Sequence, residues 1–321
     1  MRASSTPLPV VLTLREIMLD LESGRSQPLR PTDRLLSLRA RRRPTLGGPT
    51  FLRSYVTARA LGRIHPRLAR RSLLRLWLTP WVHRASRRPA TGLANDTRPW
   101  SLHHDGRTLS GFTGGAGPTA VLVHGWAGRA ADWRHIAQGL ITAGWRVVAP
   151  DLPAHGTTDG RTTDAFELAR AAGAVLRHER PDAVVAHSMG FPIVLLAFED
   201  GVDAPETLVA LAPGRRMIRA LDRFGDQARL RPALVDELRR ANQRRFGQDV
   251  WEVLDVDRSL PDLAPTGLIV HDADDADVPI ADGRDIADRW PGAAFVATHG
   301  LGHRRILRDP HVRELVVDAL S

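Results

Sequence analysis

The sequence contains no cysteine among its 321 residues. This absence excludes disulfide bonds, thiolate metal sites and a cysteine nucleophile. It leaves the redox compartment open and removes one positive argument for secretion. Lysine is absent as well, so all 45 basic residues are arginines. Exclusive use of arginine is more simply a coding bias than a chemical choice, and it weakens any functional argument from arginine richness alone.

Long hydrophobic runs are also missing. The longest apolar run near the start, PLPVVLTL, is far shorter than the roughly 20 residues that a membrane-spanning helix needs. Glu16, Asp20 and Glu22 follow it directly, and no small-residue cleavage site is evident, so a signal peptide is not expected. The cytoplasm is therefore the expected location.

The formal net charge of +9 is unevenly distributed. Residues 1–100 hold 20 arginines against 5 acidic residues, whereas residues 101–321 hold 25 arginines against 31 acidic residues. Residues 1–50 are broken by prolines and are expected to be a basic, disordered N-terminal arm. A solvated arm of this kind is favoured over a nucleic-acid binder, so no nucleic-acid partner is expected. Weak peripheral contact with a membrane through this basic region stays open.

The segment 51–97 is predicted to be a helical lead-in to a domain spanning 51–321, with interruptions at Pro66 and Pro80. Its stretch RLARRSLLRLWL places an apolar stripe, including Leu73 and Leu76, opposite several arginines. Such a helix either packs onto the main domain or rests on a membrane surface. Leu74 and Leu78 fall among the arginines and blur the amphipathic pattern, which favours packing.

From about residue 98 the pattern changes to alternating strands and helices. WSLHH-DG-RTLSGF predicts a hairpin that turns at Asp105-Gly106. Apolar runs then predict buried strands, connected by helical segments: TAVLVHG, WRVVAPD, DAVVAHS, TLVALAP, TGLIVHD and AAFVATHG. This order predicts an α/β fold with a parallel sheet and helices on both faces. The interval 214–262 is too long for a simple crossover and predicts a small helical cap inserted over one edge.

Ser188 lies in VVAHSMGF, where a buried strand runs into a serine and Gly190 follows two residues later. This arrangement resembles the nucleophile elbow G-x-S-x-G, in which small neighbours permit a tight strand-to-helix turn. Ala186 replaces the first glycine of the motif. The alternative is that Ser188 is only the N-cap of an ordinary strand-to-helix loop.

An acyl-transfer site also needs two N–H groups for an oxyanion. In AVLVHGWAG the chain turns sharply after a strand, which leaves the N–H of Trp126 free to face a ligand; otherwise the glycine is merely steric. The N–H of Met189, directly after the serine, is the second candidate. Trp126 and Phe191 are also predicted to line an apolar substrate pocket, although Phe191 is equally compatible with core packing.

A base that reaches the serine is expected in the loop after the last strand, GLGHRRIL, which points to His303. His299 lies at the end of that strand and is the weaker candidate. In APDLPAHG, Asp151 and His155 are expected to be structural, since His155 precedes the nucleophile in the chain.

These motifs together, HGW, AHSMG, HDADDADVP and GLGHRRIL, resemble those of the α/β-hydrolase superfamily, in the order Ser, Asp, His from about residue 99 to 321. The resemblance implies an eight-stranded, mostly parallel sheet whose second strand is antiparallel. It also implies a cap after the sixth strand, where the interval 214–262 lies. The region before residue 98 has no general counterpart in the superfamily, although RLARRSLLRLWLTP resembles the helical lead-in of some bacterial members.

The acidic run VHDADDADVP holds four carboxylates: Asp272, Asp274, Asp275 and Asp277. An EF-hand reading fails, because the positions that need an oxygen ligand, a glycine and a glutamate hold Ala276, Asp277 and Gly283; no metal is expected. The family pattern H-G-x-x-D-x-x-V-P, laid on residues 271–279, places the triad acid at Asp275, with Asp274 as the alternative. The other carboxylates are expected to be solvated or to stabilise the loop.

The sequence therefore predicts a serine hydrolase that cleaves a small-molecule carboxylic ester, thioester or lactone through Ser188, His303 and Asp275, without a cofactor. Serine at the elbow excludes a dehalogenase of this superfamily, which needs a carboxylate nucleophile. Acyltransferases and peptidases use the same triad, and a non-catalytic ligand-binding protein on the same fold is a further alternative. The substrate and the oligomeric state are not determined by the sequence.

Overall fold

The structure, a computed structural model, describes residues 66–80 and 96–321. The expectations about the arm at 1–50 and about most of the lead-in at 51–97 lie outside these residues. The strands are β1 (Thr97–His104), β2 (Arg107–Gly114), β3 (Thr119–Val123), β4 (Arg146–Asp151), β5 (Ala183–His187), β6 (Thr207–Leu211), β7 (Thr266–Asp272) and β8 (Ala294–Thr298). The α-helices are α4 (Pro66–Trp77), α5 (Arg134–Thr142), α6 (Ala165–Glu179), α7 (Gly190–Glu199), α8 (Met217–Gln227), α9 (Pro232–Phe246), α10 (Val250–Val253), α11 (Ile280–Ala287), α12 (Gly302–Arg305) and α13 (Pro310–Leu320).

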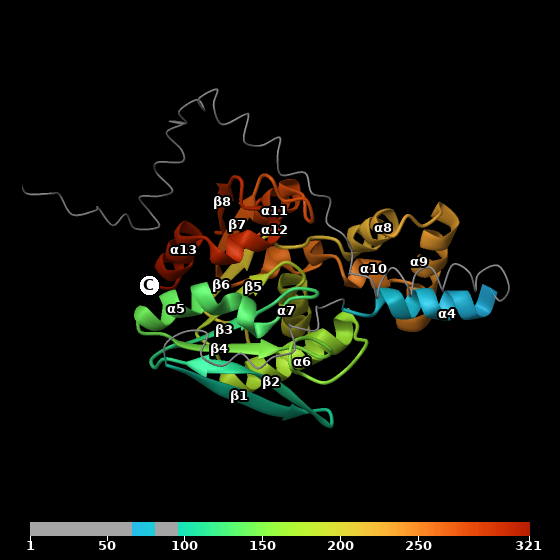
Figure 1. Cartoon of the computed structure of the whole chain (residues 1–321). Coiled ribbons are helices and arrows are strands. Elements are labelled where there is room, and N and C mark those ends of the chain that lie inside the picture. The colour runs from blue at the N-terminus through green and yellow to red at the C-terminus, as the bar shows by residue number, and fades with distance from the viewer. Residues whose placement is uncertain (1–65, 81–95) are drawn as a thin grey trace, which may run out of the picture.

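Within the described residues these strands form one eight-stranded sheet in the order β1-β2-β4-β3-β5-β6-β7-β8 (Figure 1). The second strand pairs antiparallel with β1 and with β4, and the other neighbouring pairs are parallel. The predicted fold class is therefore confirmed. Each of the six apolar runs contains one strand of the sheet, and the predicted hairpin turns at Asp105 and Gly106, where φ is +48° and +69°. Positive φ at both residues suits a two-residue hairpin turn.

Helices cover both faces of the sheet because its central strands are apolar on both sides. Val121 and Val123 of β3 belong to the core cluster that includes α6, α7 and α11. Ala120 and Leu122 of the same strand belong to the cluster on the opposite face, which includes α5 and α13. Alternate side chains point to opposite faces of a strand, so a continuous apolar run becomes a strand buried on both faces.

Helix α4 packs on the helical segment between β6 and β7. Its Leu73 and Leu76 are buried in a cluster with Leu221 and Phe224 of α8, and the rings of Trp77 and Phe224 lie 5.4 Å apart at an angle of 68°. Burial of each leucine contributes about 1.5–3 kcal/mol. The apolar stripe of α4 is therefore used for packing within the protein, as the sequence favoured. In the described ranges no helix is long and apolar enough to cross a membrane.

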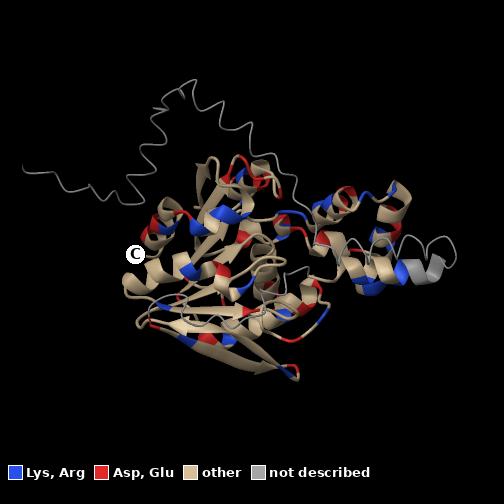
Figure 2. Cartoon of the chain, in the orientation of Figure 1, with Lys and Arg blue, Asp and Glu red and all other residues tan. Residues whose placement is uncertain are grey.

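The segment between β6 and β7 is connected to the chain after β7 by arginine–aspartate ion pairs. Arg215 binds Asp285 of α11 as well as Asp257 of its own segment, and Arg219 of α8 binds Asp282 of α11. Figure 2 shows basic and acidic positions close together along α8 and α9. These pairs tie the helical segment to the element that directly follows the acidic run.

Candidate active site

Ser188 occupies a tight turn between β5 and α7. Its φ of +54° lies in the left-handed region, which is uncommon for a residue with a side chain. A Cβ at Gly190 would lie 2.4 Å from the carbonyl oxygen of Val123, so only glycine fits there. Ala186, which replaces the first glycine of the motif, is fully buried in the core, where its methyl group is accommodated. The local backbone is therefore a tight strand-to-helix turn with the geometry that the resemblance implies, which differs from an ordinary N-cap serine.

A chain of hydrogen bonds links Ser188 to His303 and Asp275. The distance from His303 Nε2 to Ser188 Oγ is 2.9 Å, and the distance from His303 Nδ1 to Asp275 Oδ2 is 2.7 Å. The three residues follow the carboxyl ends of β5, β8 and β7, so the parallel sheet brings them to one edge. The structure thus brings the three predicted catalytic residues together, although they are up to 115 positions apart in the chain.

Of the four carboxylates in the acidic run, Asp275 is the one that contacts His303. Its other oxygen, Oδ1, accepts hydrogen bonds from the N–H groups of Asp277 and Val278, at 2.7 and 2.8 Å. Burial alone would raise the pKa of Asp275, but hydrogen bonds from His271 and His303 outweigh it and hold the pKa well below its ordinary value. Asp275 is therefore ionised, as a partner that orients an imidazole must be.

Asp274 and Asp277 lie at the margin of this arrangement. Asp274 Oδ2 accepts a hydrogen bond from the N–H of Gly300, and the Asp277 carboxylate lies 3.8 Å from Arg223 of α8. The alternative acid, Asp274, thus binds the loop before His303 instead of the imidazole. In the described residues no group of three or more histidine, aspartate or glutamate side chains is arranged to hold a metal ion.

Asp272 has a larger structural role than a solvated loop residue. It is fully buried, and its carboxylate accepts hydrogen bonds from the N–H groups of Leu301 and Gly302 and from the hydroxyl of Thr298. Burial raises its pKa, but these hydrogen bonds outweigh burial and lower it. Asp272 therefore shapes the loop that presents His303, which makes it the loop-stabilising member of the run.

Two backbone N–H groups belong to residues that adjoin Ser188 in the chain or at the contact between Gly125 and Ser188. Within the described part of the chain, neither the N–H of Trp126 nor that of Met189 donates a hydrogen bond. A Cβ at Gly125 would lie 2.8 Å from the Cβ of Ser188, so glycine lets the two loops touch. Free donors from two loops that meet at a serine are the arrangement that an oxyanion requires.

Buried histidines hold the loop around Trp126 in place. His155 Nε2 accepts a hydrogen bond from the N–H of Ala127 at 3.0 Å, and His155 Nδ1 lies 2.9 Å from the carbonyl oxygen of Pro153. His124 Nε2 likewise accepts from the N–H of Leu152, at 3.0 Å. Asp151 Oδ1 accepts from the N–H of Ala130. His155 and Asp151 are thus structural, as the sequence indicated, and both imidazoles must be neutral to accept these bonds.

The stability of the protein is expected to fall between pH 7 and pH 5. Burial, followed by the influence of His124, lowers the pKa of His155 from 6.5 to about 3. Below pH 6.5 the unfolded chain binds a proton that the folded chain refuses, so the free energy of unfolding decreases as the pH falls toward 3. His155 alone should cost about 2 kcal/mol by pH 5, measurable by urea unfolding at each pH.

His155→Gln is the matched variant for this measurement, because an amide oxygen still accepts from the N–H of Ala127 without titrating. Its stability should depend less steeply on pH over the same interval. Equal slopes for the variant and the wild-type protein would show that His155 does not titrate on unfolding as the structure requires.

The side chains of Phe191 and His299, two further candidates from the sequence, lie away from Ser188. Phe191 does not reach the site: its side chain is fully buried, and its ring packs against Trp290 with the centroids 5.8 Å apart. Its place in a substrate pocket is therefore corrected to a place in the core. His299 is exposed at the end of β8 and makes no contact with Ser188, so His303 is the histidine that the fold brings to the serine.

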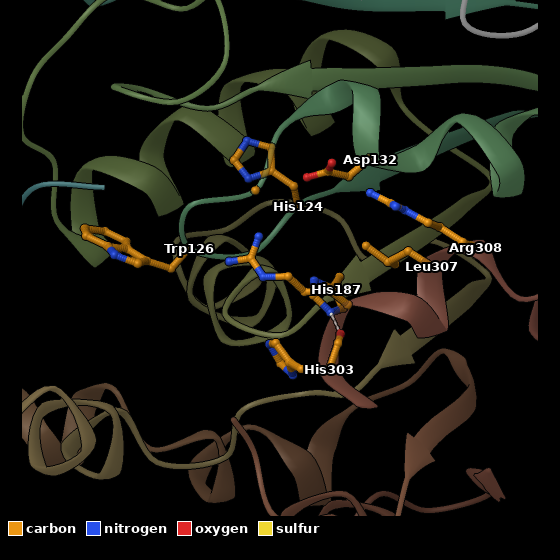
Figure 3. Close-up of a pocket in the computed structure, with 9 residues that line it drawn as sticks. His124, Trp126, Asp132, His187, His303, Leu307 and Arg308 are labelled. Atoms are coloured by element: carbon orange, nitrogen blue, oxygen red, sulfur yellow. Dashed lines mark hydrogen bonds between the residues drawn. The ribbon is translucent and has the colours of Figure 1, made fainter. Parts of the chain in front are cut away.

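A pocket lined in part by His303 also contains residues that the sequence did not single out. It is lined by His124, Trp126, Gly128, Asp132, His187, His303, Arg304, Leu307 and Arg308 (Figure 3). His187 Nε2 lies 2.8 Å from the carbonyl oxygen of His303, so the residue before the serine also fixes the histidine loop. The position of His187 directly before Ser188 was the available signal. Arg304 and Arg308 lie one and five positions after His303, and no motif in the sequence assigned them a role.

Comparisons with known proteins agree with this fold. The model of the Alpha/beta hydrolase family matches residues 120–317. The chain belongs to the alpha/beta hydrolase family. Part of the chain is also similar to the magnesium-chelatase 30 kDa subunit of Rhodobacter capsulatus, with 35% identity over 84 residues, which span 25% of this chain and only 29% of that protein.

Solved structures share the fold at low sequence identity. One is a bacterial membrane phospholipase A, with a TM-score of 0.54 and 16% identity over 84% of this chain and 97% of that one. Another is an esterase from Exiguobacterium antarcticum, with a TM-score of 0.52 and 18% identity over 68% of this chain and 97% of that one. Identities this low extend to the fold and not to the substrate.

Proposed function

We propose that the protein is a serine hydrolase that cleaves carboxylic esters, or the related thioesters and lactones, through an acyl-enzyme intermediate. The observation that carries the proposal is the continuous hydrogen-bonded chain Ser188 Oγ, His303 Nε2, His303 Nδ1, Asp275 Oδ2, with distances of 2.9 and 2.7 Å. A serine, an imidazole and a buried carboxylate in this order form a device for activating the serine hydroxyl.

In the first half of the reaction, Ser188 Oγ attacks the acyl carbonyl carbon while His303 Nε2 takes the hydroxyl proton. The N–H groups of Trp126 and Met189 bind the negative oxygen of the tetrahedral intermediate. His303 then gives its proton to the leaving alcohol as the carbon–oxygen bond breaks. Asp275 remains ionised throughout, orients the ring and stabilises the imidazolium.

In the second half, water attacks the acyl-enzyme and His303 Nε2 accepts a proton from it. The second tetrahedral intermediate uses the same two N–H groups, and collapse returns the proton to Ser188 Oγ as the carboxylic acid leaves. No step needs a metal or an organic cofactor, because the nucleophile, the base and the oxyanion donors all come from this chain.

An apolar surface next to Met189 supports an acyl substrate. Met189 packs against a buried cluster of Ala165, Val250 and Leu254. Other partly buried apolar side chains pack against the same cluster: Phe166, Leu196, Met217 and Phe246. Met217 and Phe246 belong to α8 and α9, so the helical segment between β6 and β7 helps to enclose this surface. Apolar walls with a few convergent polar groups are typical of small-molecule sites.

Labelling with a fluorophosphonate probe tests the proposal directly. The probe should add once to the full-length protein, and the adduct should map to the tryptic peptide 178–215, because trypsin does not cut the Arg180–Pro181 bond. Ser188 is the only serine in that peptide, so no ambiguity of site remains. 4-Nitrophenyl esters from acetate to decanoate, together with a lactone and a thioester, should then define the acyl preference. Absence of labelling, or labelling elsewhere, would contradict the assignment.

A further inference from the structure

The pocket that His187 and His303 help to line is bounded by two walls from segments far apart in the sequence. One wall is the loop after β3, with Trp126 and Gly128, and the other is the helical turn that begins at α12, with Arg304, Leu307 and Arg308. In Figure 3, Trp126 lies on one side of the pocket and Asp132, Leu307 and Arg308 lie on the other, with His124, His187 and His303 between them. A group bound here would lie next to both the proposed base and the proposed oxyanion donor Trp126.

The side chains of the two arginines in this pocket, Arg304 and Arg308, make no ion pair or hydrogen bond with any described residue. Neighbouring arginines differ: Arg305 donates to the carbonyl oxygen of Gly300, and Arg313 lies 3.7 Å from Glu314. Arg304 and Arg308 are four positions apart in consecutive helical turns, α12 and the 3₁₀-helix Ile306–Arg308, so both face one side. Like charges at this spacing repel each other, and the fold offers them no internal partner.

The remaining groups of the pocket leave it positive. Asp132 is its one carboxylate among the described residues, and it already accepts a hydrogen bond from the N–H of Arg129 at 3.1 Å. Burial lowers the pKa of His124 and of His187, so these imidazoles are neutral and add no charge. The pocket therefore contains two guanidinium groups without a partner in the described part of the chain and one carboxylate that already accepts a hydrogen bond.

We propose that Arg304 and Arg308 form an anion subsite, and that the substrate is an acyl compound carrying a second, anionic group, a carboxylate or a phosphate. This inference rests on the proposed hydrolase function, since it names the substrate class of the same site. Guanidinium groups bind both kinds of anion through paired hydrogen bonds and remain charged at every relevant pH. The anion would lie beside Trp126 and His303, and the apolar part of the substrate would lie toward Met189.

Matched substrates separate this proposal from the proposed function. 4-Butyryloxybenzoate and its neutral methyl ester differ in the charge on the alcohol part, and release of the butyryl group is measured in both, so that cleavage of the methyl ester is not counted. The 4-nitrophenyl monoester of adipic acid and its neutral methyl ester place the charge on the acyl part instead, and 4-butyryloxyphenyl phosphate replaces the carboxylate by a phosphate. Hydrolysis of the neutral esters reports on the hydrolase itself, and the ratio of kcat/KM for the charged over the neutral ester reports on the subsite.

In the wild-type protein this ratio should exceed about 10 for at least one charged ester, and it should fall as NaCl rises from 0.05 to 0.5 M. In the double variant Arg304→Gln/Arg308→Gln the ratio should fall to about 1. Arg313→Gln removes a positive charge from α13, outside the pocket, and should leave the ratio unchanged. A ratio near 1 for every wild-type pair, or a preference that survives in a double variant whose thermal melting is unchanged, would overturn the proposal.

Discussion

Ser188→Ala is expected to lower kcat for the best ester by about 10⁶-fold, with no adduct formed by the fluorophosphonate. The hydroxyl is the only group in the arrangement that can form the acyl-enzyme, so its loss removes the covalent route and not merely one interaction. In a serine hydrolase, removal of the nucleophile alone costs about as much as removal of the whole triad. The residual rate would come from the oxyanion donors and from binding.

Structural damage is easily separated from this effect. The variant should fold, because Ser188 Oγ has His303 as its hydrogen-bond partner and alanine fills nearly the same volume. Binding of a non-hydrolysable substrate analogue should persist. A variant that kept more than about one hundredth of the wild-type kcat would mean that another nucleophile acts.

Asp275→Asn is expected to lower kcat by about 10⁴-fold, the size of effect seen when a triad aspartate becomes an amide. Asparagine has nearly the same shape, and its amide oxygen would keep the two backbone hydrogen bonds that Oδ1 accepts. Its NH₂ group would then face His303, where it donates a hydrogen bond and cannot accept one. The hydrogen bond to His303 Nδ1, 2.7 Å long in the structure, would then favour the imidazole tautomer whose Nε2 carries the proton. That tautomer cannot accept the proton of Ser188.

Asp277→Asn is the matched control, since it makes the same chemical change two residues away. Asp277 is partly exposed and lies 3.8 Å from Arg223, and the chain from Asp275 to Ser188 does not pass through it. Its kcat should stay within about twofold to threefold of the wild-type value, because exposed ion pairs contribute little. Equal losses in both variants would place the effect on the fold of the loop instead of on proton transfer.

The sequence predicted the sheet and the three hydrogen-bonded residues Ser188, His303 and Asp275 for related reasons. Strands buried on both faces appear as apolar runs, and side chains at the ends of parallel strands converge on one edge. Ser188, Asp275 and His303 each lie within five residues after the end of such a strand, so their proximity follows from the topology. Here a local pattern and the global fold point to the same positions.

Other parts of the site depend on contacts that a local pattern does not contain. The role of Asp272 arises from bonds to Leu301 and Gly302, about 30 positions away. Phe191 was predicted to line the pocket, but α7 is apolar on nearly every face and buried, so periodicity cannot show which side of the helix would meet a substrate. Arg304 and Arg308 line a pocket only because the loop after β3 lies opposite them in the fold.

The left-handed backbone of Ser188 lowers the stability of the fold at the position where the proposed reaction needs a side chain. A residue with a side chain costs of order 1 kcal/mol or more in this region, whereas glycine adopts it freely. Glycine at position 188 would therefore relax the turn while removing the reaction. Serine at this position therefore lowers the stability of the fold, which the proposed reaction would explain. At the φ of +54° of Ser188, the proposed reaction and the stability of the fold therefore have opposite requirements.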